Sequence, residues 1–135
     1  MAEAPATRQT RQKEALARVF ADAARALSVD EVLAAGRSYY PALSERTVFR
    51  RLRELMDERK LVRVFLPGHP ARYEVPTHVH RPHLVCRTCQ QVFVLPTETP
   101  SLLDSYPVPP GFHVDGEEVI FYGTCPECGP ASPSD

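Results

Sequence analysis

Apolar residues recur at helical spacing in three stretches of the first sixty residues, which predicts three helices. The first covers residues 10–27. The second opens at SVDE (residues 28–31), a capping-box pattern, and ends near Gly36. The third begins after Ser44, a suitable N-cap residue, and covers residues 45–59.

Two short apolar segments follow the predicted helices, at residues 61–66 and 71–75. They flank the turn sequence PGHP (residues 67–70), and this pattern is typical of a β-hairpin. Two helices, a turn, a third helix and a two-stranded wing make up the winged helix-turn-helix arrangement. We therefore predict this arrangement for the first part of the chain.

The second part of the chain predicts a small α/β domain. A short helix is expected over residues 101–106, and Asp115-Gly116 marks an expected hairpin turn. The predicted fold class is α+β, a winged helix-turn-helix followed by a small zinc-containing domain. Short strands are expected at residues 84–85, 92–95, 112–114 and 119–122.

Charge separates the two parts more sharply than the net value of −1 suggests. Residues 1–76 carry 14 Lys/Arg against 10 Asp/Glu, whereas residues 77–135 carry 2 against 7. A basic segment followed by an acidic one is typical of a polyanion-binding domain joined to a second domain. We expect domains at residues 1–76 and 83–129, a hinge at 77–82 and a disordered tail at 130–135.

The third predicted helix carries a basic and aromatic face opposite its apolar stripe. Positions i, i+3, i+4 and i+7 share one side of a helix, and arginine and aromatic side chains there suit the DNA major groove. The alternative is a solvated face whose arginines pair with neighbouring carboxylates. The absence of acidic residues from this side favours DNA binding. The four residues are Arg46, Phe49, Arg50 and Arg53.

Four cysteines carry the most specific signal in the chain. Cys86-x-x-Cys89 and Cys125-x-x-Cys128 form two knuckles that can aim four thiolates at one ion, as in a tetrahedral zinc site. Such a closed shell leaves no position for substrate, so the predicted zinc is structural, with one ion per chain. Two disulfides are the alternative, which the paired spacing and an expected cytoplasmic location disfavour.

A second cluster of metal-ligand types lies at the junction of the two parts. Glu74, His78, His80 and His83 offer one carboxylate and three imidazoles within ten residues. These groups suit Zn²⁺, Fe²⁺ or Mn²⁺ alike, and a site astride a hinge would link domain orientation to metal occupancy. The alternative is a polar linker whose histidines form local hydrogen bonds. The spacing leaves both open.

From Arg8 to Cys128 the chain resembles the ferric uptake regulator family of metal-responsive bacterial repressors. RQTRQK (residues 8–13) resembles the family's opening motif, and SERTVFRRL (residues 44–52) resembles its recognition helix. HLVCRTC (residues 83–89) and FYGTCPEC (residues 121–128) resemble its two knuckles.

The resemblance implies a homodimer, paired through the C-terminal domain, that binds a palindromic operator in double-stranded DNA and represses metal-uptake or stress genes. It implies that Phe49 and Arg50 meet bases or phosphates. Arg8 would reach the minor groove, and Thr47 belongs to the same DNA-binding set.

Several positions depart from the family's pattern for its sensing metal sites. Glu74, His80 and His83 remain in register, and His78 is an additional donor. One interpretation is a rearranged site for a second cation. The other is a metal-independent family member in which Arg81 supplies a fixed positive charge. The departures are Ala26-Leu27, Arg81, Pro82, Val94 and Glu117.

Other classes of function fit less well. A zinc-ribbon module that binds a protein partner is the main competitor to a DNA-binding regulator. An enzyme is not expected, because the sequence has no nucleophile elbow, phosphate loop or open three-ligand metal motif. No apolar run approaches the ~20 residues of a membrane span, and no secretory signal pattern is present, so we expect no membrane partner.

Overall fold

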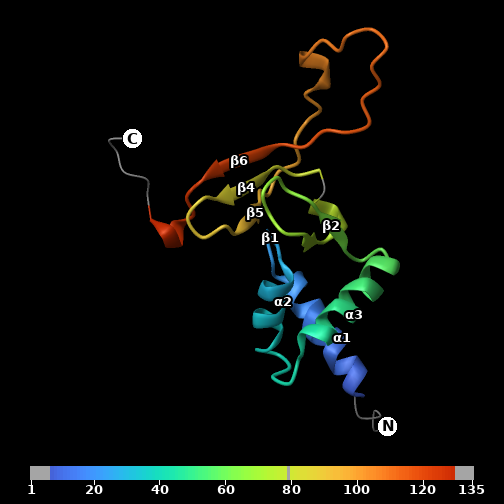
Figure 1. The fold of residues 1–135 in the computed structure, drawn as a ribbon, viewed down its shortest axis with the longest axis vertical. Helices are drawn as coiled ribbons and strands as arrows, with labels where there is room; N and C mark the ends of the chain where they lie inside the picture. The colour runs from blue at the N-terminus through green and yellow to red at the C-terminus, as the bar shows by residue number, and fades with distance from the viewer. Residues whose placement is uncertain (1–6, 79, 130–135) are drawn as a thin grey trace. The chain divides into compact units, whose positions relative to one another are not determined.

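The structure is a computed structural model that describes residues 7–78 and 80–129 of the 135 (Figure 1). The chain divides into two compact units, Met1–Val79 and His80–Asp135. This boundary falls inside the segment predicted as a hinge. Val79 and the tail predicted for residues 130–135 lie outside the described residues.

Three helices build the first unit: α1 (Arg8–Ala21), α2 (Val29–Gly36) and α3 (Glu45–Asp57). Their apolar stripes meet in one core whose fully buried members include Leu16 and Leu52. Gly36 is required where α2 packs, because a Cβ there would lie 2.6 Å from a methyl group of Leu43. The predicted helical part of the fold is confirmed.

The predicted helix starts are also confirmed by their caps. Ser28 and Glu31 form the complete capping box at α2, with the Ser28 Oγ accepting from the Glu31 N–H at 3.2 Å. At α3 the Ser44 Oγ accepts from the N–H of Thr47 at 3.2 Å. These contacts satisfy backbone donors that a helix start leaves without intrahelical partners.

The first helix is shorter than predicted. It ends at Ala21, and the chain then forms the short strand β1 (Arg25–Ala26). Leu27 exchanges backbone hydrogen bonds with Tyr73 at 2.9 and 2.8 Å, which requires extended backbone. This long-range pairing overrides the helical propensity of the alanine-rich stretch.

The predicted hairpin is confirmed in β2 (Val62–Val64) and β3 (Arg72–Glu74), which pair antiparallel with Arg63 opposite Tyr73. Arg59 joins α3 to β2 with a φ of 61°, the left-handed conformation that ends a helix. The N–H groups of Lys60 and Leu61 both donate to the Leu55 carbonyl, which fixes the hairpin to the helix end.

The second unit contains β4 (His83–Cys86), β5 (Val92–Val94) and β6 (Ile120–Gly123), together with short 3₁₀ turns such as η3 (Pro126–Cys128). Strand β4 pairs antiparallel with β5 and parallel with β6. The buried apolar side chains of the second unit come mainly from β4 and β5, where Val85 and Val92 are almost fully buried.

The segment between β5 and β6 differs from its prediction. Residues 112–114 form no strand, and the helix expected over 101–106 is a single 3₁₀ turn, η2 (Leu103–Ser105). Prolines at 100, 107, 109 and 110 remove backbone donors, and every side chain from 101 to 118 is exposed. The Asp115-Gly116 hairpin is also absent, because residues 112–114 form no strand that could pair with β6. The segment from β5 to β6 is instead a long connection, drawn in orange in Figure 1, that brings β6 parallel to β4.

Candidate functional site

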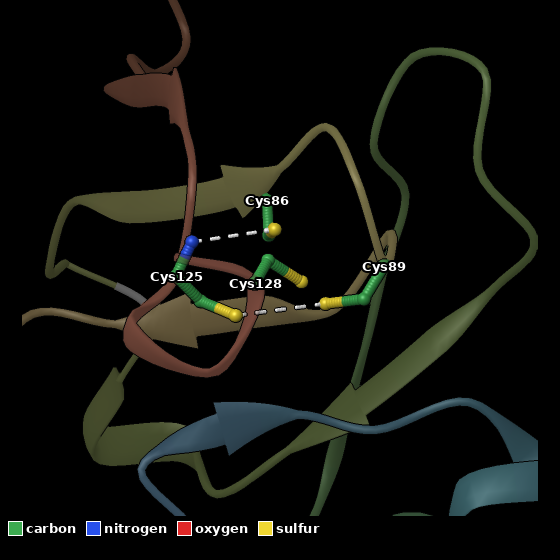
Figure 2. A group of neighbouring side chains, drawn as sticks. All are labelled: Cys86, Cys89, Cys125 and Cys128. Carbon is green, nitrogen blue, oxygen red and sulfur yellow. Dashed lines mark hydrogen bonds between the residues drawn. The ribbon is translucent and has the colours of Figure 1, made fainter. Parts of the chain in front are cut away.

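The four cysteines of the second unit converge on one point (Figure 2). Cys86 ends β4 and Cys89 lies in the turn that follows, while Cys125 precedes η3 and Cys128 is its last residue. Their sulfur atoms all lie within 4.8 Å of one another. Cys86 and Cys125 are buried and Cys89 is exposed. Segments far apart in sequence therefore supply a four-sulfur group.

The spacing of these sulfur atoms fits a shared ion. A tetrahedral zinc with Zn–S bonds of ~2.3 Å has edges of ~3.8 Å between sulfur atoms. The Sγ atoms of Cys89 and Cys125 lie 3.8 Å apart. A disulfide would bring two sulfur atoms to ~2.05 Å, so the distance supports metal ligation rather than a cross-link between these two residues.

The knuckle backbone favours the thiolate form of Cys86. N–H groups of Cys89 and Cys125 donate to its sulfur, the latter at 3.3 Å, and lower the pKa of the Cys86 thiol to about 6. The neighbouring Cys125 sulfur and burial raise the pKa of Cys128 to about 12. Four close thiolates repel one another, so a divalent cation that binds here must displace protons.

The outer face of α3 is the second candidate site. Val48 and Leu52 are buried beneath the helix, whereas Arg46, Arg50 and Arg53 are exposed on its other side. Phe49 is 50% exposed among them. Within the part of the chain that the structure describes, none of these arginines forms an ion pair, so their donors face solvent.

Two other residues of α3 have structural roles. Thr47, predicted as a DNA contact, is buried, and its hydroxyl accepts a hydrogen bond from Ser44 at 3.0 Å. Its contact with DNA stays a prediction. Arg51 is also buried and donates to Gln12 of α1 at 3.2 Å and to Glu54 at 2.6 Å. The hydrogen bond from Arg51 lowers the pKa of Glu54. Arg51 thereby fixes α3 against α1.

Arg8 and the four residues predicted as a hinge metal site belong to several different elements of the chain. Arg8 is exposed in the first turn of α1. Glu74 in β3 and His78 belong to the first unit, whereas His80 and His83 belong to the second. Among the described residues, the four cysteines are the one group close enough to share an ion. A second metal site at the hinge remains a prediction.

The sequence interpretation missed one feature of the hairpin. The Arg63 guanidinium lies 5.8 Å from the ring centroid of Phe65 and 5.9 Å from that of Tyr73. Phe65 is 65% exposed. Strand alternation was the available signal, because residues 63 and 65 share one face of a strand.

The basic face of α3 and the four-cysteine group are the two candidate sites of this chain. The ferric uptake regulator family model matches residues 5–102, and the chain belongs to this family of transcriptional regulators. No helix of the described residues is long and apolar enough to cross a membrane.

The relatives found are mostly mycobacterial regulators. "Ferric uptake regulation protein 2" of Mycolicibacterium fortuitum is 29% identical, covering 92% of this chain and 87% of its own. "Transcriptional regulator FurA" of Mycobacterium tuberculosis is 31% identical, covering 73% and 68%.

Solved structures share the fold. A zinc-bound manganese uptake regulator matches with a TM-score of 0.68 and 20% identity, over 88% of this chain and 91% of its own. The Helicobacter pylori ferric uptake regulator matches with a TM-score of 0.61 and 20% identity, over 89% and 81%.

Proposed function

We propose that this regulator is a homodimeric, zinc-stabilised repressor that binds operator DNA through α3. The observation that carries the proposal is the unpaired basic face of α3 in the described residues, with Phe49 exposed among three arginines. Residues 1–76 form the DNA-binding domain, 77–82 the hinge and 83–129 the dimerisation domain.

The α3 face matches what a major groove offers. Arginine can pair with the O6 and N7 atoms of guanine or clamp a phosphate, and an aromatic ring can lie against a thymine methyl group. Two copies of α3 related by a two-fold axis would read the halves of a palindrome. Arg8, exposed in the first turn of α1, would add a minor-groove contact beside each half-site.

Zinc is the ion that best suits the four-cysteine group. Thiolate donors with tetrahedral spacing favour zinc, and a shell completed by protein ligands leaves no site for substrate or water. The ion therefore stabilises the second unit and takes no part in catalysis. From its resemblance to the family, the repressor is proposed to act on metal-uptake or stress genes.

A second cation, Zn²⁺, Fe²⁺ or Mn²⁺, is proposed to act as corepressor on Glu74, His78, His80 and His83. A specific observation favours a competing, metal-independent form. The Arg81 Nε atom is buried and has no hydrogen-bond partner among the described residues, so a fixed charge occupies part of the hinge. Titration of zinc-replete protein separates the two, because only a corepressor site predicts tighter DNA binding with added cation.

The Arg50→Ala variant tests DNA binding directly. Loss of a base or phosphate contact should weaken binding by about 1–3 kcal/mol in a gel-shift titration of a duplex selected by the wild-type chain from a random pool. Arg18→Ala is the matched control, since Arg18 is exposed on α1 and stacks 5.5 Å from the ring of Tyr39. Wild-type binding by Arg50→Ala would instead favour a module that docks a protein partner.

A further inference from the structure

Two adjacent arginines of α3 have opposite surroundings. Arg50 is exposed on the face proposed to bind DNA, whereas the Arg51 side chain is only 3% exposed. Arg51 donates to the side chain of Gln12 in α1 at 3.2 Å, and its Nε atom is buried with no hydrogen-bond partner among the described residues. Arg51 is therefore a nearly desolvated cation, and DNA contact by the outer face of α3 assigns it no role.

The charge partner of Arg51 is the Glu54 carboxylate, one turn further along α3. A hydrogen bond of 2.6 Å joins the two groups. The Nζ atom of Lys13 in α1 lies 4.0 Å from the same carboxylate oxygen. Two cations on the inner side of α3 therefore hold the Glu54 carboxylate toward α1.

Glu54 is also a neighbour of Arg50. Residues i and i+4 of a helix lie next to each other on its surface, and Arg50 stands four positions before Glu54. The hydrogen bond from Arg51 lowers the pKa of Glu54, and the charge of Arg50 contributes to the same shift. The carboxylate nevertheless pairs with Arg51, and Arg50 forms no ion pair within the described residues. Without Arg51, the same carboxylate would compete for Arg50.

We propose that Arg51 is a positioning residue for DNA binding, which holds the Glu54 carboxylate toward α1 and so keeps Arg50 unpaired and a negative charge away from the DNA phosphates. Replacement of a buried ion pair by uncharged groups is often neutral for stability, so stability alone does not account for the pair. The inference rests on the proposed function, because it presumes that Arg50 contacts DNA.

The Arg51→Met variant tests the positioning role. It leaves Glu54 charged but 37% exposed to water, so it buries no unpaired charge. The full-length zinc-loaded protein is titrated with a duplex selected by the wild-type chain from a random pool. We expect the affinity to fall about tenfold, because the carboxylate then competes for Arg50 and repels phosphates. Removal of the carboxylate as well, in Arg51→Met/Glu54→Gln, should restore the affinity to within about twofold of wild type.

Two matched variants separate this role from net charge and from packing. Arg51→Met/Glu14→Gln has the same net charge as the rescued variant but keeps the Glu54 carboxylate, so it should bind as weakly as Arg51→Met. Glu14 is exposed on α1 and forms no ion pair within the described part of the chain. Arg51→Lys keeps a cation beside Glu54 and should bind DNA within about twofold of wild type.

The outcomes separate the inference from the proposed function. Wild-type affinity in Arg51→Met, or equal recovery in the two double variants, overturns the positioning role and leaves DNA binding by α3 intact. Weak binding that persists in Arg51→Met/Glu54→Gln also overturns it and assigns Arg51 to packing alone. Wild-type affinity in Arg50→Ala overturns both.

Circular dichroism verifies the fold of each variant before titration. If Arg51→Met fails to fold, Arg51→Gln takes its place in every comparison, because its amide keeps a donor for Gln12 and carries no charge. The same loss, and the same recovery with Glu54→Gln, is expected of it, and wild-type affinity in Arg51→Gln contradicts the positioning role.

Discussion

The two units of this chain reach stability by different physical means. The first packs a continuous core of ten buried residues from three helices, β3 and the segments that join these elements. The described part of the second buries five apolar residues, and two of these, Cys86 and Cys125, belong to the metal centre. A core that small does not offset the entropy of ordering a chain, so we expect the ion to supply the missing stability.

Removal of the zinc ligands should have the largest effect. In Cys86→Ser/Cys125→Ser, the two buried donors are lost, and with them a metal-binding free energy of order 10 kcal/mol. Hydrogen exchange on the full chain should show loss of protection in β4, β5 and β6 while α1, α2 and α3 stay protected. Thr88→Ser, a change within the first knuckle that spares every ligand, should behave as wild type. Retained protection in the double variant would contradict the contrast between the units.

Truncation of a side chain in the helical core should have the next largest effect. It should destabilise the first unit and leave the second unit folded. Leu52 is 1% exposed, and Leu52→Ala should cost about 2–5 kcal/mol of unfolding free energy in the first unit, because it leaves a cavity. Denaturant unfolding followed by helical circular dichroism measures the change. Leu102→Ala removes the same atoms from a side chain that is 40% exposed and should change little. Zinc released together with the helices in Leu52→Ala would show that the units do not unfold independently.

The pH dependence of zinc binding should be the smallest effect. A thiol must lose its proton to bind, so affinity rises with pH. Cys86, with a pKa of about 6, is already a thiolate above that pH, so it releases a proton to zinc only below it. We expect the slope of log affinity against pH to steepen by about one as the pH falls below about 6. Competition with a chromophoric chelator measures it, and a constant slope would show that the knuckle backbone does not favour the Cys86 thiolate.

The sequence predicted the features that depend only on residues close together in the chain. The Ser28 and Ser44 caps, the amphipathic stripe of α3 and the two Cys-x-x-Cys turns follow from neighbouring residues alone. The end of α1 did not follow, because the pairing of Leu27 with Tyr73 joins positions 46 residues apart. Long-range pairing of this kind leaves no periodic trace near the end of the helix.

The segment from 101 to 118 shows a second limit of sequence patterns. Its apolar residues predicted a helix and a strand, yet they are exposed, including Tyr106 at 66% and Phe112 at 72%. Periodicity indicates a regular element only where a surface buries one face of it. The burial of Thr47 is similar, because the sequence gives no sign that its hydroxyl accepts a hydrogen bond from Ser44.

Native mass spectrometry of the full chain with a selected duplex tests the central claim most directly. The account predicts one duplex bound by two chains that carry two tightly held zinc ions, and a smaller fraction of complex in Arg50→Ala with the zinc retained. A complex formed equally well by zinc-free chains, or by a single chain, would contradict the claim that a metal-stabilised unit pairs two DNA-reading helices.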